Sequence, residues 1–168
     1  MAVSQTGNAY FVQENGGMFY ITTNSERKNM PGRGKDIAVG ADGTVYCIGG
    51  RAVPGGHGIW KWAGKQWEKV KGRGARRIAV GPNGNPWIVT DKNEIFKQNV
   101  SGGWKRVEGQ ASAIAVGPEG SVMVLGVKES KGGFSVKKLG SDGQWHVITN
   151  GATEMSIGKN GRPYFVTK

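Results

Sequence analysis

A short phrase recurs along the chain at a nearly constant interval, and this interval constrains the fold more than any single residue. Each copy is a small apolar run, then Gly-x-x-Gly, then two or three apolar or aromatic residues, as in residues 78–89. The last glycine of the phrase falls at positions 7, 43, 84, 120 and 161, so the copies lie 36 or 41 residues apart in alternation. A period of this length is typical of arrays of small units that stack to bury their apolar faces.

Each period has the pattern of four short β-strands. The first is a small Ile-Ala-Val run, and Gly-x-x-Gly is a tight turn in which Pro82 and Pro118 supply a preset φ angle. No segment carries a 3.6-residue apolar stripe long enough for a helix. Four antiparallel strands per period, repeated radially, predict an all-β chain folded as a β-propeller of four-stranded antiparallel blades. A barrel or a sandwich is the alternative, but neither explains so regular a repeat.

The period divides the chain into four full repeats plus a two-stranded fifth half-blade, all within one domain, 1–168. The expected repeats are approximately 1–36, 37–77, 78–113 and 114–154, with a partial repeat at 155–168. The two longer repeats carry their additional residues between the second and third strands, which suggests the duplication of a two-blade unit.

The partial repeat leaves open how the ring closes. An open or five-bladed ring, completion by another chain, and a fragment of a longer product all remain alternatives. An unpaired strand edge at Tyr164, Phe165 and Val166 predicts self-association or pairing with a partner's strand.

Charge and composition limit the classes of partner. The net charge of +11 favours an acidic partner, which can be nucleic acid, an anionic lipid or glycan, or an acidic protein surface. The single cysteine, Cys47, rules out a disulfide within the chain and is expected to be a small buried residue. Without a membrane-spanning apolar run or a signal-like N-terminus, we expect a soluble, intracellular protein with no membrane insertion.

Basic residues gather in the connections between the predicted blades. Those connections share one face of a propeller with the loops between second and third strands, so a one-sided patch is predicted. Arginine suits phosphate, sulfate or carboxylate because its fork binds two oxygens at once. The alternative is clustered charge that only aids solubility. The predicted basic patch consists of Arg33, Lys35, Arg51, Lys71, Arg73, Arg76 and Arg77, with His57 as a further candidate.

The aromatic residues divide into repeated and unrepeated positions. Trp67, Trp104 and Trp145 occupy one repeat position and are predicted to pack between blades. Trp62 is not repeated, which makes it the candidate for an exposed contact. No arrangement typical of catalysis is present, so we expect no enzyme, no catalytic residue, no metal site and no cofactor.

These repeats resemble the tectonin repeat family. The resemblance rests on a tryptophan, an apolar residue three later, a glycine-containing loop and Ile-Ala-Val-Gly, as in residues 67–81 and 104–117. It implies a β-propeller, often of six blades, and a non-enzymatic recognition module, commonly a lectin. The blade count of this chain departs from that pattern.

Three functions follow as expectations. The first is a lectin for anionic or modified glycans, and the second is a structural protein that docks its basic face on an acidic protein partner. Nucleic-acid binding is the third.

Overall fold

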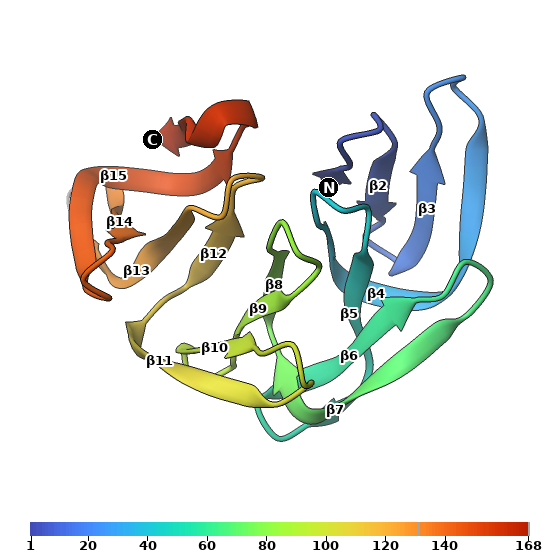
Figure 1. Ribbon diagram of the computed structural model, residues 1–168, viewed down its shortest axis with the longest axis horizontal. Coiled ribbons are helices and arrows are strands. Elements are labelled where there is room, and N and C mark those ends of the chain that lie inside the picture. The colour runs from blue at the N-terminus through green and yellow to red at the C-terminus, as the bar shows by residue number, and fades with distance from the viewer. Residues whose placement is uncertain (131, 168) are drawn as a thin grey trace.

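The computed structural model describes residues 1–130 and 132–167. These residues form sixteen β-strands and one short 3-10 turn, η1 (Lys159–Gly161) (Figure 1). The strands are β1 (Ala2–Val3), β2 (Ala9–Val12), β3 (Gly17–Ile21), β4 (Arg27–Val39), β5 (Val45–Val53), β6 (Gly56–Trp62), β7 (Trp67–Ala75), β8 (Arg77–Val80), β9 (Pro86–Val89), β10 (Glu94–Gln98), β11 (Trp104–Gln110), β12 (Ala113–Val116), β13 (Val122–Ser130), β14 (Gly133–Leu139), β15 (Trp145–Ile157) and β16 (Pro163–Thr167).

All the strand pairs are antiparallel between consecutive strands, and they form sheets of seven, four and five strands. Only β8–β11 make the separate four-stranded sheet that the sequence predicts. Elsewhere β4 and β15 are long and change partner midway, β4 from β3 to β5 and β15 from β14 to β16. Strand pairing continues through these connections, because Arg33 still pairs with β3 while the next residue, Gly34, already pairs with β5, and Ala152 pairs with both β14 and β16. Neighbouring four-stranded units are thereby merged into larger sheets.

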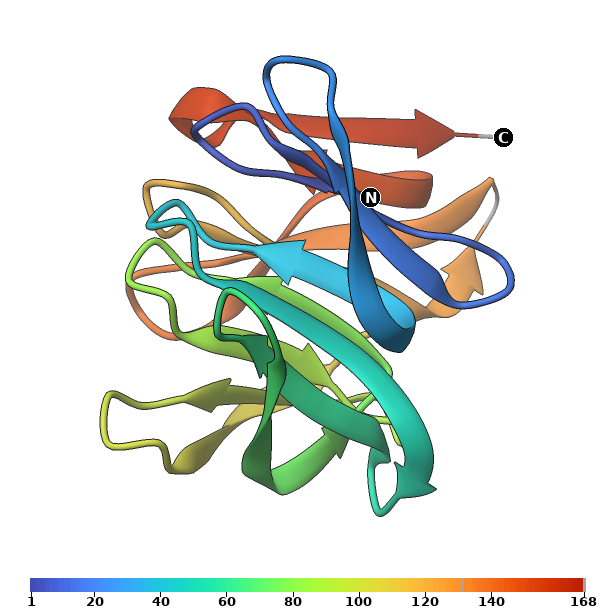
Figure 2. The ribbon, with the colours of Figure 1, turned by 90° about the vertical axis from the view of Figure 1, so that its right-hand side faces the viewer.

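The sheets are arranged around a centre in an arc whose open side lies between the N-terminal and C-terminal strands (Figure 1). From the side they are fanned one above another (Figure 2). The all-β, antiparallel, propeller-like fold expected from the repeat is therefore confirmed. Among the described residues, no helix has the length and apolar character needed to cross a membrane.

The core consists of four clusters, each of which joins one repeat to the next. Tyr10 and Met18 pack with Ile37 and Cys47, and the following clusters join the second repeat to the third and the third to the fourth. The last cluster, around Leu125, has the fewest buried residues. Apolar burial therefore weakens toward β16, where no further sheet follows among the described residues.

The repeated tryptophans clasp neighbouring repeats, as predicted for that position. The indole N–H of Trp67 donates to the carbonyl of Pro31 at 2.8 Å, that of Trp104 to Lys71 at 3.0 Å and that of Trp145 to Glu108 at 2.7 Å. Each ring also packs against a buried cluster between two repeats. We call each such contact a tryptophan clasp.

The additional residues of the longer repeats extend the β5–β6 and β13–β14 hairpins. The tip of the first of these hairpins touches the end of β7 that leads to the next sheet, because the N–H of Gly74 donates to Pro54 at 3.2 Å, and it also touches the β9–β10 loop, where the N–H of Asp91 donates to Gly55 at 3.1 Å. Loops between second and third strands thus lie on the same face as the connections between sheets. We call this the loop face.

Candidate ligand-binding site

Arg33, Arg51 and His57 lie close together on the loop face. Arg33 belongs to β4 and precedes Gly34, which pairs with Gly49 of β5. Arg51 lies in an irregular stretch of β5 where the register to β6 shifts between Gly49 and Ala52. The His57 Nδ1 atom is 3.1 Å from the carbonyl oxygen of Gly50 in the same stretch.

A pocket of about 210 Å³ lies beside Arg33, between the first and second repeats. The rings of Trp60 and Trp67 give it aromatic surface, and Arg33 gives it a positive charge. Arg33 Nη1 donates to the carbonyl of Asn15 at 3.2 Å, and no described carboxylate lies within 4 Å of the guanidinium, so its charge is uncompensated. The pocket is lined by Met18, Gly32, Arg33, Cys47, Gly50, Trp60 and Trp67.

Cys47 lies at this pocket but is 2% exposed. Burial raises the pKa of its thiol to about 12, so the side chain is a neutral thiol at physiological pH. The prediction of a small buried residue is confirmed. A thiolate nucleophile or metal ligand is thereby disfavoured at this position.

Trp62, the candidate for an exposed aromatic contact, does not line this pocket. Trp62 packs against Trp67 with ring centroids 4.9 Å apart and is half-buried. Its neighbour Trp60 is the ring that lines the pocket. Sequence reasoning missed Trp60 because its position in the third strand looks like an ordinary repeat position, as Phe96 is in β10. The signal available in the sequence was the change from Phe96 to a tryptophan at that register.

Arg73 and Arg76 have partners within the chain. The Arg73 guanidinium lies 3.8 Å from the centre of the Phe96 ring, and Phe96 belongs to the next sheet. Arg76 Nη2 donates to Asn93 Oδ1 at 2.9 Å and to the carbonyl of Ser112 at 3.1 Å. These two arginines therefore tie neighbouring repeats together on the loop face, although both remain exposed.

The other patch residues lie apart from this group. Arg77 lines the central channel, Lys35 lies near Glu14 in a separate surface hollow, and the carbonyl of Lys71 accepts the Trp104 clasp. Within residues 1–130 and 132–167, ion pairs shorter than 4 Å join only Lys28–Glu26, Arg106–Glu94 and His146–Asp142. The positive charge of the basic patch is therefore not neutralised by close carboxylates in the described chain.

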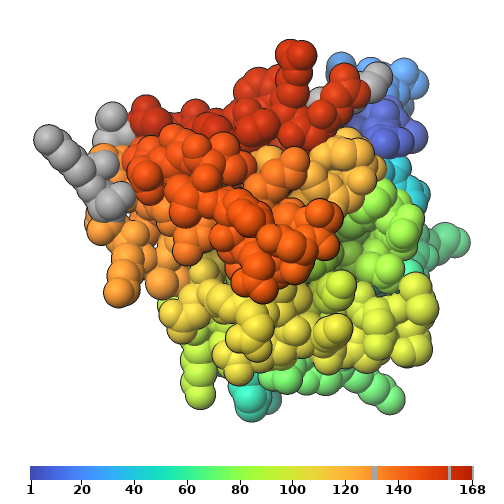
Figure 3. Space-filling model, turned by 60° about the vertical axis from the view of Figure 1, so that its left-hand side comes forward, coloured from blue at the N-terminus to red at the C-terminus, as the bar shows by residue number. Residues whose placement is uncertain are grey.

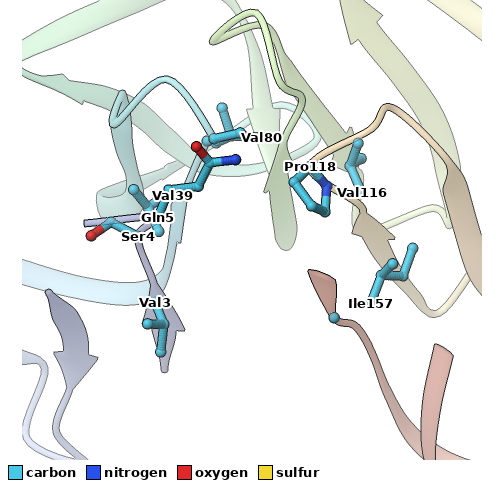
Figure 4. Close-up of a pocket in the computed structure, with 11 residues that line it drawn as sticks. Val3, Ser4, Gln5, Val39, Val80, Val116, Pro118 and Ile157 are labelled. Carbon is cyan, nitrogen blue, oxygen red and sulfur yellow. The ribbon is translucent and has the colours of Figure 1, made fainter. Parts of the chain in front are cut away.

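The central channel has two parts, of about 550 and 620 Å³. Five residues line both parts, and they occupy the same position in the five copies of the repeated phrase (Figure 4). They are Val3, Val39, Val80, Val116 and Ile157. This apolar ring separates the turn side of the channel from a polar end that holds Asp36, Arg77 and Glu154.

Asp36 is the most constrained acid of that polar end. Its carboxylate accepts hydrogen bonds from the N–H of Ile37 at 3.0 Å and from the N–H of Ile78 at 3.1 Å. Burial raises the pKa of Asp36 above its ordinary value, and the Ile78 bond and the Arg77 charge only partly oppose that rise. The carboxylate is occupied by main-chain donors, so we assign it a structural role.

The acids in the turns and the two histidines also form contacts with nearby residues of the chain. Asp42 accepts bonds from the N–H of Thr44 at 3.0 Å and its hydroxyl at 2.6 Å, as turn chemistry predicts. The hydrogen bond from the N–H of Gln144, and then the 2.9 Å contact with His146 on the same exposed turn, lower the pKa of Asp142. Among the described residues, no three potential ligands gather in a metal-binding group.

The predicted association edge is the last strand of its sheet. β16 pairs with β15 on one side, and no described strand pairs with its other side. Tyr164 is 61% exposed and Val166 is 54% exposed, whereas Phe165 packs against the last core cluster. Self-association or pairing with a partner's strand at Tyr164, Phe165 and Val166 stays a prediction.

Comparison with solved structures shows the same fold in larger proteins. A virginiamycin B lyase from Staphylococcus aureus matches with a TM-score of 0.68 at 15% identity, covering 98% of this chain and 61% of the lyase. YCF48 bound to D1 peptide matches at 0.64 and 14% identity, covering all of this chain and 61% of that one. An auxiliary nutrient binding protein from Bacteroides ovatus matches at 0.62 and 14% identity, covering 91% of this chain and 42% of that protein. At these identities the likeness concerns the fold alone.

The chain spans about three fifths of the length of the first two structures that it matches. A comparison with curated protein sequences finds no match. The family comparison is more specific, since residues 52–166 match the Tectonin domain. That match extends over more than half of the chain and includes the Trp67 and Trp104 repeats on which the resemblance was based. The chain therefore belongs to the Tectonin domain family.

Proposed function

We propose that this chain is a non-enzymatic binding module, and that it acts as a lectin for anionic or modified glycans. The observation that carries the proposal is the side pocket, in which the uncompensated guanidinium of Arg33 adjoins the rings of Trp60 and Trp67. A sugar presents C–H groups to an aromatic face, whose electron density is negative. A carboxylate, sulfate or phosphate on the same sugar suits the fork of arginine.

The size of the pocket supports a small ligand. Its 210 Å³ lies below the roughly 300–1,000 Å³ typical of pockets for drug-sized molecules. We infer that it holds one sugar ring of a longer glycan, and that Arg51 and His57 border the path of the remaining rings. The other basic residues of the loop face then attract the glycan without contacting its recognised ring.

We further propose that the scaffold is four complete propeller blades and the first two strands of a fifth. Repeats of the strand order β8–β11 account for every described strand once β4 and β15 are each divided at their change of partner. The side pocket then lies between the first and second blades. A ligand held there contacts two blades at once, so its binding should stabilise the fold.

The test is a glycan array read at low and at high salt with the full chain and two variants. Arg33→Gln removes the charge at the pocket, and Lys65→Gln removes the same charge from the β6–β7 turn on the opposite face. We expect binding of particular anionic sugars that persists at high salt. Arg33→Gln should weaken it about tenfold or more, since hydrogen bonds to charged groups contribute about 1.5–3 kcal/mol. Lys65→Gln should leave it unchanged.

Two results would refute the lectin proposal. Binding to every polyanion, nucleic acid included, that disappears at high salt would indicate a non-specific electrostatic surface. Equal losses of affinity in Arg33→Gln and Lys65→Gln would show that the ligand does not bind in the pocket.

The second candidate is a scaffold that docks its basic face on an acidic protein. It is favoured by the loop-face bases that lack close carboxylates, and a propeller of similar fold, YCF48, has been solved with a peptide bound. This candidate predicts no signal on the glycan array and salt-sensitive binding to an acidic protein. Charge reversal at Arg51 should then weaken docking without unfolding the chain, because the Arg51 side chain makes no hydrogen bond between sheets among the described residues.

A further inference from the structure

Aromatic rings occupy one register in the third strands of the first three repeats. They belong to Phe19 of β3, Trp60 of β6 and Phe96 of β10. Each is the third residue from the end of its strand, and in every case the last residue of the strand pairs with the first residue of the outer strand of the same repeat. The rings are therefore equivalent positions of the repeat.

Two of these rings hold an arginine of the chain. The Arg27 guanidinium lies 4.0 Å from the centre of the Phe19 ring, and the Arg73 guanidinium lies 3.8 Å from that of Phe96. A cation within about 6 Å of a ring centre is attracted by the negative face of the ring. This register therefore suits a cation that lies over its ring.

The third ring, that of Trp60, holds no cation of the described chain. Within residues 1–130 and 132–167, the remaining contact of this kind joins Lys97 to Trp87, with 5.4 Å between the Lys97 Nζ atom and the ring centre. Tryptophan attracts cations more strongly than phenylalanine does. The ring best suited to a cation is thus the one that lines a pocket instead of carrying an arginine.

Arg33 and Arg73 are equivalent arginines with different contacts. Each follows a glycine of positive φ, Gly32 at +84° or Gly72 at +98°, and each glycine follows the acceptor of a tryptophan clasp. Arg73 lies over its ring, whereas Arg33 Nη1 donates to the carbonyl of Asn15 at 3.2 Å. This contact turns Arg33 toward the β2–β3 loop, so the equivalent ring stays open to the side pocket.

The fourth repeat has no ring at this register, because the third residue from the end of β14 is Lys137. Figure 3 shows the outer strands β11 and β15 of the third and fourth repeats, in yellow and orange, side by side on one face of the molecule. Trp145 joins them by its clasp to Glu108. Among the described repeats, the free ring is therefore a feature of the boundary between the first and the second.

The lining of the side pocket favours one kind of cation. Trp60, Trp67, Met18 and Cys47 line it together with Arg33 and two glycines, and no side chain among them carries an oxygen. A primary ammonium or a guanidinium would leave N–H donors without side-chain acceptors there. A quaternary ammonium has no N–H donor to satisfy, and aromatic rings are its usual binding partners in proteins.

The guanidinium of Arg33 adds a second requirement. It repels an isolated cation, and no described carboxylate lies within 4 Å to reduce its charge. A ligand that carries a phosphate beside its ammonium removes this repulsion, because the fork of arginine binds two phosphate oxygens at once. The pocket therefore suits a zwitterion that joins a quaternary ammonium to a phosphate.

We propose that the side pocket binds phosphocholine, with the trimethylammonium group against the rings of Trp60 and Trp67 and the phosphate on Arg33. This ligand goes beyond the anionic sugars of the proposed function, although it uses the same pocket and competes with them. Glycans and lipids both carry phosphocholine, so the same chemistry has two sources.

The test is isothermal titration of the full chain with phosphocholine, phosphoethanolamine and choline. We expect saturable binding of phosphocholine that is about fivefold or more tighter than that of phosphoethanolamine, whose N–H groups find no side-chain acceptor. Choline should bind about tenfold or more weakly than phosphocholine, since it lacks the phosphate for Arg33.

Arg33→Gln should change the affinities for two of these ligands in opposite directions. It should weaken phosphocholine binding about tenfold or more, because the phosphate loses its charged partner. It should strengthen choline binding, because the repulsion between like charges disappears. Lys65→Gln removes the same charge from the β6–β7 turn, away from the pocket, and should change neither affinity. A general disturbance of the fold cannot raise one affinity while it lowers the other.

The ring is tested at Trp60. Trp60→Leu keeps an apolar side chain without the ring and should weaken the binding of phosphocholine and of choline about fivefold or more. Trp60→Phe has the residue found at the same register in β3 and β10, and its affinities should lie between those of wild type and Trp60→Leu. Thermal unfolding checks the fold of both variants. Trp60→Phe keeps the test decisive if Trp60→Leu does not fold.

A glycan that carries phosphocholine and vesicles of phosphatidylcholine distinguish the two sources. Retention of either one, blocked by free phosphocholine, supports the proposal and identifies the carrier. No saturable binding at millimolar phosphocholine would overturn the proposal, and so would equal affinity for phosphoethanolamine. Parallel changes for choline and phosphocholine in Arg33→Gln would overturn it as well.

This inference and the lectin proposal can fail separately. Anionic sugars that bind in the pocket while phosphocholine neither binds nor displaces them would overturn this inference alone. Phosphocholine binding that depends on Arg33 and Trp60, without any signal on the glycan array, would overturn the lectin proposal alone.

Discussion

The carboxylate of Asp36 joins two sheets by accepting a hydrogen bond from the main-chain N–H of Ile78, 42 residues farther along, at 3.1 Å. The other carboxylate oxygen accepts the N–H of Ile37. One side chain thus fixes the start of two inner strands. Asp36→Asn replaces one of its acceptor oxygens with a donor that faces an N–H. We expect a loss of about 1–3 kcal/mol in the free energy of unfolding, measured by denaturant titration.

The same residue should make stability depend on pH. Because burial raises the pKa of Asp36, the folded state retains a proton that the unfolded state has already released. The stability that the protonated Asp36 contributes is therefore fully present below its ordinary pKa of 3.8. It is lost as the pH rises through the pKa of Asp36 in the folded state. Other carboxyls with lowered pKa values, such as Asp142, act in the opposite direction. The quantity to measure is the difference in unfolding free energy between wild type and Asp36→Asn at a series of pH values. A difference that does not change with pH between 3 and 7 would contradict the raised pKa.

The tryptophan clasps predict a stability difference between two similar substitutions. Trp104→Phe removes the indole N–H that reaches Lys71 and should cost about 1 kcal/mol for the hydrogen bond, in addition to the loss of ring area. Trp87→Phe is the control, because Trp87 is also partly buried, packs against the neighbouring core cluster, and makes no indole hydrogen bond among the described residues. Thermal and denaturant unfolding of both variants give the comparison. Equal destabilisation would mean that the hydrogen bond adds nothing to packing.

Two glycines separate backbone strain from close approach. Gly109 and Gly102 both have positive φ, +101° and +85°, but only a Cβ at Gly109 would meet a neighbour, the Trp145 ring. Gly102→Ala should therefore cost about 1 kcal/mol for the left-handed backbone alone. Gly109→Ala should cost more, because the clasp of Trp145 must also move. The prediction is refuted if the unfolding free energies of the two variants agree.

Cys47 should resist thiol reagents in the folded protein. Its pKa of about 12 and its burial leave almost no accessible thiolate at pH 8. We expect one thiol to react rapidly in denaturant and very slowly under native conditions, as followed by a chromogenic disulfide reagent. Rapid native labelling would show that the side pocket opens to Cys47.

The repeat made much of the fold predictable. The Ile-Ala-Val phrase, the Gly-x-x-Gly turn and the tryptophan position are local patterns, and they recur as inner strands, turns and clasps. The merging of sheets through β4 and β15 was not predictable, since it depends on whether a connection such as residues 32–35 keeps pairing with the strands on both of its sides. The positions of those neighbouring strands in the folded protein decide whether it does.

The candidate site was predicted less well, and the reason is spatial. Arg33 and Arg51 lie in different strands, and only the pairing of Gly34 with Gly49 brings them near one pocket. Arg73 and Arg76 look equally available in the sequence, yet Phe96, Asn93 and Ser112 engage them. Trp62, the exposed contact expected from the sequence, packs on Trp67, whereas Trp60 lines the pocket.

The sequence by itself determined the strands, the turns and the repeat, because each of these follows from residue types at short separation. Only the tertiary structure decided which arginines remain available and which ring lines the pocket. These features depend on contacts between residues of neighbouring repeats, some 33–42 residues apart along the chain, such as the Trp104–Lys71 and Asp36–Ile78 contacts. No pattern within one repeat specifies the surface that the next repeat presents to it.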